Sequence, residues 1–274
     1  MKFDVELVGK IGSMALINKE YGDINYNIIA RLSRELRPGY IWVTSGATEI
    51  GRLDYIKRRG QELSGPDCDN KTDYSAEGQS ILMGCYRQYV DSRYAIRQIL
   101  VEHQHFNDEA KREHLREMLL RCPAQQAIPI INYNDAVSYE ENRKMEIQAI
   151  KNKKGRAVEC VDNDETAAQI ACLVKSEKLL ILTSVDGIYD DVNDESTLVS
   201  EISGRNTEEL LANIAEHQAH CQGASRRGAG GARAKLEYIK APVMNGTEVI
   251  IAGSRHSIKD ILGGKAPCTR IRVR

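Results

Sequence analysis

Short apolar segments recur along the chain, separated by stretches in which the apolar residues follow a helical period. Residues such as Ile28, Leu32 and Leu36 fall on one helical face and predict a helix. Segments that are apolar on both faces and rich in β-branched residues predict strands buried on both sides. The six predicted strands are residues 4–8, 40–44, 99–101, 128–132, 179–183 and 248–252. This alternation predicts an α/β fold with a mainly parallel sheet between helical layers.

Three segments interrupt the alternation, and we interpret them as loops or flaps. They are residues 53–70, which are polar, residues 138–159, which are charged, and residues 221–231, which are rich in glycine. Within the second segment, Lys153-Lys154-Gly155-Arg156 fits either a hairpin tip or a basic patch. A solvated turn is the preferred interpretation, because four residues are a weak signal for nucleic-acid binding.

Length and charge limit the class of protein. A chain of 274 residues fits one domain covering residues 1–274, with two lobes at roughly residues 1–160 and 161–274. The formal net charge of −1 predicts no nucleic-acid or membrane partner, so small-molecule substrates are expected. The sequence contains no apolar stretch of about 20 residues. Its start lacks the apolar run of a signal peptide, so we expect a cytoplasmic location.

The cysteines and histidines predict no metal or disulfide framework. Seven cysteines without a C-x-x-C pair fit a reducing compartment, in which they would be buried or incidental thiols. His217, His220 and Cys221 share helical spacing, but structural zinc normally needs four ligands and no second cluster is visible in the sequence. We therefore predict no metal ligands among the side chains.

The acidic segment Asp162-Asn163-Asp164-Glu165 lies directly before an apolar helical run at residues 166–174. A helix N-terminus carries unsatisfied N–H groups and partial positive charge, which suits the organisation of phosphate chemistry. Asp162 is the residue we expect to cap this helix.

Polar and glycine residues also follow several predicted strands, where ligands bind in open parallel sheets. Lys10 and Gly12 follow the first strand, and no Walker A pattern is present, so Lys10 alone would be a surface lysine at a turn. The Asn132–Asp135 stretch alone would be a turn with side-chain hydrogen bonds. The glycine-rich run that ends at Lys235 fits either a phosphate-binding loop or a surface loop.

Taken in order, these segments resemble the amino acid kinase family, and within it the members that phosphorylate glutamate. The resemblance extends from residue 5 to residue 269. The motifs that carry it are Lys10-x-Gly12-Ser13, Thr44-Ser45-Gly46-Ala47, Ala76-x-Gly78-Gln79, Pro129-Ile-Ile-Asn132-x-Asn134-Asp135, Asp162-Asn163-Asp164, Leu182-Thr183-x-x-Asp186-Gly187-x-Tyr189 and Gly228-x-Gly230-Gly231-x-x-x-Lys235-Leu236.

The resemblance implies an αβα sandwich that transfers the γ-phosphoryl group of ATP to the side-chain carboxylate of L-glutamate, the first step toward proline. It implies Mg²⁺ on the nucleotide, a homo-oligomer such as a dimer or tetramer, an acceptor-binding N-terminal lobe and a nucleotide-binding C-terminal lobe. Because the chain stops where the kinase domain of the family stops, we expect the form that lacks the C-terminal RNA-modification-type domain.

The resemblance also implies roles for individual residues. Lys10 and Lys235 would act on the reacting oxygens and Asp164 would orient them. The acceptor would be held by Ser45, Gly46, Asp135 and Asn163. The nucleotide would be held by Lys10, Gly12, Thr183, Ser184, Ala229, Gly230, Gly231, Ala232, Arg233, Ala234 and Lys235. A carboxylate acceptor is already ionised at neutral pH, so this chemistry needs alignment and charge neutralisation rather than a general base.

The sequence departs from the family pattern at both implied substrate sites. Tyr133 replaces a glutamate and Ser184 an aspartate, while Ala229 and Ala232 replace a threonine and a methionine; the segment between Asp135 and Asp162 is longer than usual. A nucleoside monophosphate, a small phosphorylated or phosphonate compound or another amino acid is therefore an alternative acceptor. A noncatalytic sensor or storage protein is a third alternative, which the retained lysines and Asp164 disfavour.

Overall fold

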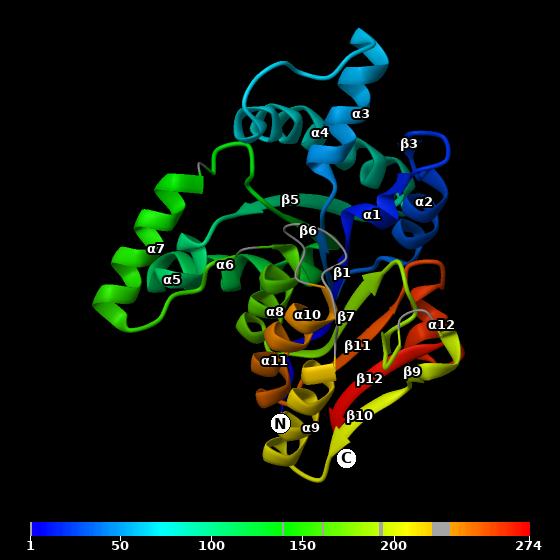
Figure 1. Cartoon of the computed structure of the whole chain (residues 1–274), viewed down its shortest axis with the longest axis vertical. Helices are drawn as coiled ribbons and strands as arrows, with labels where there is room; N and C mark the ends of the chain where they lie inside the picture. The colour runs from blue at the N-terminus through cyan, green and yellow to red at the C-terminus, as the bar shows by residue number, and fades with distance from the viewer. Residues whose placement is uncertain (1, 139, 161, 192–193, 221–230) are drawn as a thin grey trace. The chain divides into compact units, whose positions relative to one another are not determined.

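A computed structural model describes residues 2–138, 140–160, 162–191, 194–220 and 231–274. Its centre is an eight-stranded sheet with the order β10-β12-β11-β7-β1-β4-β6-β5 (Figure 1). These strands are β1 (Val5–Ile11), β4 (Tyr40–Thr44), β5 (Ala95–Val101), β6 (Ala127–Tyr133), β7 (Ser176–Thr183), β10 (Glu201–Gly204), β11 (Glu248–Gly253) and β12 (Cys268–Val273). The β1/β7, β7/β11, β5/β6 and β10/β12 pairs are parallel, whereas β11 and β12 are antiparallel.

The six strands predicted from the sequence are all present in this sheet, and the α/β class with a mainly parallel sheet is confirmed. Strands β10 and β12 were not predicted. β10 is only four residues long, and arginines interrupt the apolar pattern of β12. A strand with charged residues on one face lacks the continuous apolar signal of a fully buried strand.

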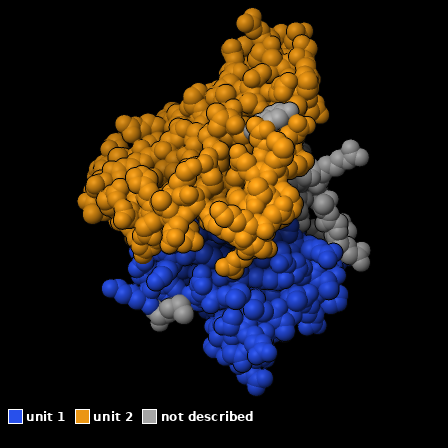
Figure 2. Space-filling model, turned by 90° about the vertical axis from the view of Figure 1, so that its left-hand side faces the viewer, with its two compact units in different colours: residues 1–11, 39–43, 162–274 blue, residues 12–38, 44–161 orange. Residues whose placement is uncertain are grey.

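The chain forms two compact units, which Figure 2 shows in different colours. Unit 1 comprises residues 1–11, 39–43 and 162–274, and unit 2 comprises residues 12–38 and 44–161. Each unit therefore contains segments that are distant in the sequence.

In unit 1, helices pack beside the parallel strands β11, β7 and β1 (Figure 1). The side chains of Leu179–Leu182 in β7 are fully or almost fully buried, which explains the uninterrupted apolar pattern of this strand. The helices of the unit are α8 (Asn163–Leu173), α9 (Thr207–His220), α10 (Gly231–Tyr238), α11 (Lys240–Met244) and α12 (Ile258–Leu262). The unit also contains β8 (Ile188–Tyr189), β9 (Leu198–Val199) and the 3-10 turn η2 (Glu195–Thr197).

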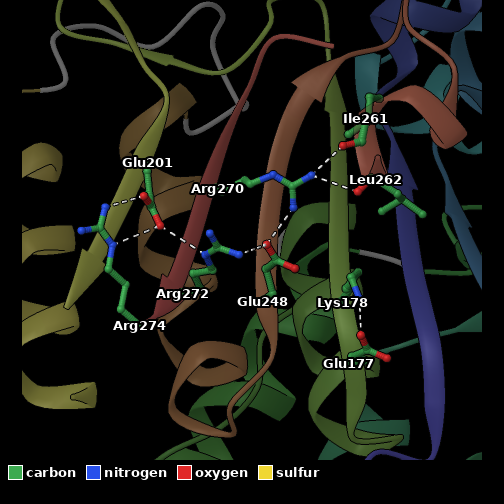
Figure 3. Close-up of polar contacts among 9 residues, drawn as sticks. All are labelled: Glu177, Lys178, Glu201, Glu248, Ile261, Leu262, Arg270, Arg272 and Arg274. Carbon is green, nitrogen blue, oxygen red and sulfur yellow. Dashed lines mark hydrogen bonds and ion pairs between the residues drawn. The ribbon is translucent and has the colours of Figure 1, made fainter. Parts of the chain in front are cut away.

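Arginines on β12, and Arg274 directly after it, pair with glutamates on the neighbouring strands (Figure 3). Arg270 bonds Glu248 of β11 at 2.8 Å and donates to the carbonyls of Ile261 and Leu262 at 2.7 and 3.1 Å. Arg274 bonds Glu201 of β10 at 2.6 Å. These contacts satisfy the charged face of β12 and attach α12 to the sheet.

In unit 2, the closest helix packing is between α3 (Ala47–Arg59) and α4 (Asp67–Tyr89). A Cβ atom on Gly78 would lie 1.9 Å from the carbonyl oxygen of Ala47, so only glycine permits this approach. The other helices are α1 (Ser13–Leu16), α2 (Tyr26–Glu35), α5 (Gln104–Asn107), α6 (Glu109–Arg121), α7 (Glu140–Lys154) and the 3-10 turn η1 (Pro123–Gln125). Two short strands, β2 (Ile17–Asn18) and β3 (Asp23–Ile24), form a separate hairpin.

Two of the three predicted loops are largely wrong. Residues 53–59 continue α3 and residues 67–70 begin α4, so the connection between them is short. Most of residues 138–159 form α7, a helix in which Ile147 is the buried residue and the remaining described side chains are polar or more exposed. A helix without an apolar stripe gives no helical periodicity to detect. Of the turn predicted at residues 153–156, Lys153 and Lys154 instead continue α7, and Gly155 follows the helix with a φ of 75°. Of the third predicted loop, Gly231 begins α10 and residues 221–230 lie outside the described residues.

No helix in the described ranges has both the length and the apolarity needed to span a membrane. The six described cysteines are free thiols. Cys85, Cys122, Cys160 and Cys268 are buried, as expected, whereas Cys68 is exposed and Cys221 lies outside the described residues.

Candidate functional site

Lys10 of β1 forms a buried ion pair with the first turn of α8 in unit 1. Its Nζ lies 2.6 Å from Oδ1 of Asp164, and both side chains are less than 10% exposed. The preceding residue, Gly9, faces the ring of Trp42 in β4, where a Cβ atom would lie 2.2 Å from a ring carbon. Glycine at this position therefore lets β1 pass the tryptophan ring and hold Lys10 in the interior.

Asp164 contacts a second lysine through its other carboxylate oxygen. Nζ of Lys235, from α10, lies 3.0 Å from Oδ2 of Asp164, and its side chain is 20% exposed. One carboxylate therefore holds the ammonium groups of two lysines from separate elements. Charge-assisted hydrogen bonds of this kind restrict the long, flexible lysine side chains.

The environment of Asp164 keeps it ionised. Burial alone would raise its pKa, but the attraction and hydrogen bonds of Lys10 and Lys235 outweigh burial and hold the pKa below the ordinary value of an aspartate. The cluster contains two ammonium groups and one carboxylate. It can therefore attract an additional anionic group.

Asp162 caps α8, as predicted from the sequence. Its Oδ1 accepts hydrogen bonds from the backbone N–H groups of Asp164 and Glu165 at 2.8 and 3.0 Å. Burial, followed by repulsion from Asp164, raises the pKa of Asp162. The two acids of this turn thus have different contacts: Asp162 bonds the backbone, whereas Asp164 bonds the lysines. Asn163 lies between them as the first residue of α8.

The predicted nucleotide residues Thr183 and Ser184 lie at the carboxyl end of β7. The Thr183 hydroxyl donates to the carbonyl oxygen of Val185 at 2.6 Å and accepts from its N–H at 3.1 Å, so it shapes the turn that follows the strand. Ser184 is exposed. Of the predicted glycine-loop residues, Gly231, Ala232, Arg233, Ala234 and Lys235 form the start of α10, whereas Ala229 and Gly230 lie outside the described residues.

The sequence interpretation assigned no role to Asp186, although this residue belongs to one of the motifs. Its buried carboxylate accepts a hydrogen bond from His256 at 2.9 Å and pairs with Arg255. A Cβ atom on Gly253 would lie 2.2 Å from its Oδ1. Asp186 therefore joins the segments that follow β7 and β11, a contact between distant residues that no local pattern indicates.

In unit 2, three of the predicted site residues lie directly before helices: Gly12 before α1, and Ser45 and Gly46 before α3. Gly12 precedes α1, and Gly46 precedes α3 with a φ of 101°. This left-handed conformation favours glycine, and a Cβ atom there would also approach Leu16 at 3.2 Å. Ser45 and Gly46 thus form the short turn that connects β4 to α3.

Polar residues at the end of β6 are also fixed by hydrogen bonds. Asn132 donates to Gln79 of α4 at 2.8 Å, in the buried interior of unit 2. Asn134 donates to Glu102 at 3.0 Å. The Tyr133 hydroxyl lies 3.0 Å from that of Ser138. Gln79, part of a sequence motif without an assigned role, therefore positions Asn132, the residue before the last one of β6.

Asp135 follows these residues and has a perturbed carboxylate. Desolvation by the surrounding protein, with a smaller contribution from Glu49, raises its pKa to about 6, while Arg143 and Lys71 act in the opposite direction. The residue nevertheless remains exposed, so water screens the effect of this shift on folding stability. Protonation near pH 6 would remove the negative charge of Asp135.

The fold and the buried cluster of two lysines around one carboxylate fit a phosphotransferase. Residues 7–253 match the model of the amino acid kinase family, and the chain belongs to this family. It is therefore a kinase-type phosphotransferase, whose family implies the use of ATP.

Named relatives are similar over nearly the whole chain. A glutamate 5-kinase from Clostridium perfringens is 28% identical over 97% of this chain and 94% of its own length. A glutamate 5-kinase from Gloeobacter violaceus is 30% identical over 98% of this chain and 69% of its own length. A third, from Alkaliphilus metalliredigens, is 30% identical over 91% of this chain and 88% of its own length.

Solved structures share the fold at lower identity. Carbamate kinase from Giardia has a TM-score of 0.61 at 16% identity, covering 98% of this chain and 99% of its own. UMP kinase from Ureaplasma parvum has a TM-score of 0.56 at 13% identity, covering 98% of this chain and 96% of its own. These similarities confirm the amino acid kinase fold.

Proposed function

We propose that this protein transfers the γ-phosphoryl group of ATP to the side-chain carboxylate of L-glutamate and so produces glutamyl 5-phosphate, the first intermediate toward proline. The observation that carries the proposal is the pair of lysines held by Asp164. The similarity to glutamate 5-kinases along the whole chain supports the choice of acceptor.

The chemistry requires little beyond alignment and charge neutralisation. A carboxylate oxygen of the acceptor forms a bond to the γ-phosphorus while the bond to the β–γ bridging oxygen breaks, and ADP leaves with the electron pair. Because the acceptor is already ionised, no proton must be removed. Negative charge is spread over the phosphoryl oxygens in the transition state, where ammonium groups such as those of Lys10 and Lys235 stabilise it.

Asp164 has the role of a positioning residue in this proposal. Its two oxygens bond the two lysines separately, which fixes the directions of their ammonium groups before a substrate binds. Preorganised charges need no rearrangement during the reaction, and this lowers the activation barrier. The depressed pKa of Asp164 keeps it ionised throughout the neutral range.

We assign Gly12, Thr183, Ser184 and the start of α10 to the nucleotide, and Ser45, Gly46, Asp135 and Asn163 to the acceptor. Exposed Asp135 offers a carboxylate to the ammonium group of an amino acid. The described residues contain no group of three or more His, Cys, Asp or Glu side chains that could hold a metal. We place Mg²⁺ on the nucleotide phosphates, where it would neutralise charge, because Mg²⁺ commonly takes substrate phosphates and water as ligands.

An acceptor screen tests the proposed function. The protein is incubated with Mg-ATP and either L-glutamate, UMP or carbamate, ADP release is measured, and hydroxylamine is added to trap an acyl phosphate as its hydroxamate. We expect ADP release and γ-glutamyl hydroxamate with L-glutamate. Turnover with UMP but not with L-glutamate would overturn the acceptor assignment, and nucleotide binding without turnover would favour a noncatalytic role.

Variants of the lysines test the assigned roles in the same assay. Lys10→Ala and Lys235→Ala should each lower kcat by about two to three orders of magnitude, because loss of one stabiliser of transition-state charge costs roughly 3–4 kcal/mol. Lys240→Ala provides a control, since Lys240 pairs with Glu237 rather than with Asp164. Near-normal kcat in either lysine variant would contradict its role.

A further inference from the structure

Arg143 of α7 is a half-buried cation without a carboxylate partner among the residues that the structure describes. Its guanidinium carbon lies 5.9 Å from the centroid of the Tyr133 ring, and one of its nitrogens donates to the carbonyl oxygen of Cys160 at 3.5 Å. The neighbouring Lys144, by contrast, is paired with Glu140 at 2.6 Å. The guanidinium also hydrogen-bonds the Tyr133 side chain, so Tyr133 and the Cys160 carbonyl restrain it. A guanidinium has five N–H donors, and those not used in these two contacts can bind a ligand.

A carboxylate of opposite charge lies in the same unit, just after Tyr133. Asp135 is exposed, and Arg143 acts on it electrostatically without forming an ion pair with it. Lys71 also favours the charged form of Asp135, and Glu49 opposes it. Unit 2 therefore presents one positive and one negative group, separated by more than the length of an ion pair, around the end of β6.

Several bonds hold α7 and the segment after it to the region of α5. His103, which is 4% exposed, bonds Glu146 of α7 at 2.8 Å. The amide of Asn107 pairs with the backbone of Val158 at 2.7 and 2.9 Å, and Lys154 donates to the Asn107 carbonyl at 2.9 Å. The helix that carries Arg143 is thus anchored, which reduces the entropy lost when Arg143 binds a ligand.

We infer that Arg143 binds the α-carboxylate of the acceptor while Asp135 binds its α-ammonium group, so that this pair selects α-amino acids. The inference rests on the proposed function. It adds that Arg143 binds the α-carboxylate of L-glutamate, the carboxylate that is not phosphorylated. A planar guanidinium matches a carboxylate through two parallel hydrogen bonds. The carboxylate and ammonium groups of an α-amino acid are complementary in charge to the guanidinium of Arg143 and the carboxylate of Asp135.

Substitution of Arg143 tests the inference through its effect on two acceptors. L-glutamate carries the α-carboxylate, whereas 4-aminobutanoate keeps the reacting carboxylate and the amine but lacks it. Arg143→Gln should raise KM for L-glutamate about ten- to a hundredfold, the effect of losing a hydrogen bond between charged groups, and leave kcat nearly unchanged. KM for 4-aminobutanoate should stay the same in Arg143→Gln. For Arg143→Lys, KM for L-glutamate should lie between the values of the wild type and Arg143→Gln.

Lys144→Gln is the matched control, because it removes the same charge from the adjacent position of α7, where Lys144 is 68% exposed. It should leave KM for both acceptors unchanged. An unchanged KM for L-glutamate in Arg143→Gln, or equal losses with both acceptors, would overturn the inference, and the L-glutamate measurement decides alone if 4-aminobutanoate reacts too slowly. A wild-type protein that phosphorylates UMP or no acceptor, instead of L-glutamate, would overturn the proposed function and this inference together.

Discussion

Asp164 combines a contribution to stability with the positioning role that we propose for it. Its carboxylate is almost inaccessible to water, yet it is ionised because Lys10 and Lys235 each bond one of its oxygens. Breaking a buried pair leaves charges without compensation, which costs far more than breaking an exposed pair. The residue that orients the two ammonium groups is therefore also one on which the fold of unit 1 depends.

The stability contributed by Asp164 should depend on pH. Its pKa is lowered in the folded state, so it contributes stability above the unfolded value of about 3.9 and loses this contribution as pH falls through the folded pKa. Asp164→Asn should lower the free energy of unfolding by about 3 kcal/mol at pH 7. The difference from the wild type should shrink below about pH 4.

Urea unfolding at pH 7, 5 and 3.5 measures this difference. Asp54→Asn is the control, because Asp54 and Arg58 form an exposed pair on α3 whose loss should cost less than about 1 kcal/mol. An Asp164→Asn deficit that is the same at all three pH values would contradict the assignment of the charge.

Among the elements, β1 and α7 differ most in what their sequences reveal. β1 is apolar on both faces apart from Lys10 and the exposed Glu6, and its burial gives a clear pattern. α7 buries Ile147 alone and has only three other apolar residues, Met145, Ala149 and Ile150, so its sequence resembles a solvated flap. Its position depends on contacts such as that between Glu146 and His103, which lie far apart in the chain.

The glycine that lets β1 pass Trp42 gives a prediction about packing. Gly9→Ala would place a Cβ atom 2.2 Å from the Trp42 ring, and such overpacking should lower the free energy of unfolding by about 1–3 kcal/mol. Gly84→Ala in α4 has nothing within 4 Å of the new Cβ and should stabilise the protein by up to about 1 kcal/mol, since alanine favours helix. Denaturant unfolding of both variants measures the effects, and equal stability would contradict the packing argument.

In the whole molecule, most residues proposed for the nucleotide and most residues proposed for the acceptor belong to different compact units. Lys10, Asp164 and Lys235 belong to unit 1, whereas Ser45 and Asp135 belong to unit 2. The first eleven residues belong to the same unit as the C-terminal part of the chain, so unit 1 is complete only after its last strands are made. Each unit therefore carries most of one proposed set of ligand contacts, whereas Asn163 of unit 1 and Gly12 of unit 2 belong to the other set.

Ligand protection against thermal unfolding should separate these two sets. A ligand at a hundred times its Kd adds about 2.7 kcal/mol to the stability of a protein that binds it only when folded. A nonhydrolysable ATP analogue with Mg²⁺ should raise Tm of the wild type and of Asp135→Ala, but much less that of Lys235→Ala. L-glutamate should raise Tm of the wild type and of Lys235→Ala, but much less that of Asp135→Ala. If either variant lost the Tm shifts with both ligands, the assignment of Lys235 to the nucleotide and of Asp135 to the acceptor would be contradicted.

Local patterns in this sequence determine the six apolar strands, the α/β class and the cap that Asp162 provides, because each depends on burial or on contacts within a few residues. The order of the motifs also singles out Lys10, Asp164 and Lys235. Their meeting at one carboxylate, the anchoring of α7 and the stacking of Arg143 on Tyr133 follow from strand order and long-range packing. Periodicity reports which side of an element is buried, whereas only the folded chain establishes which distant side chain it meets.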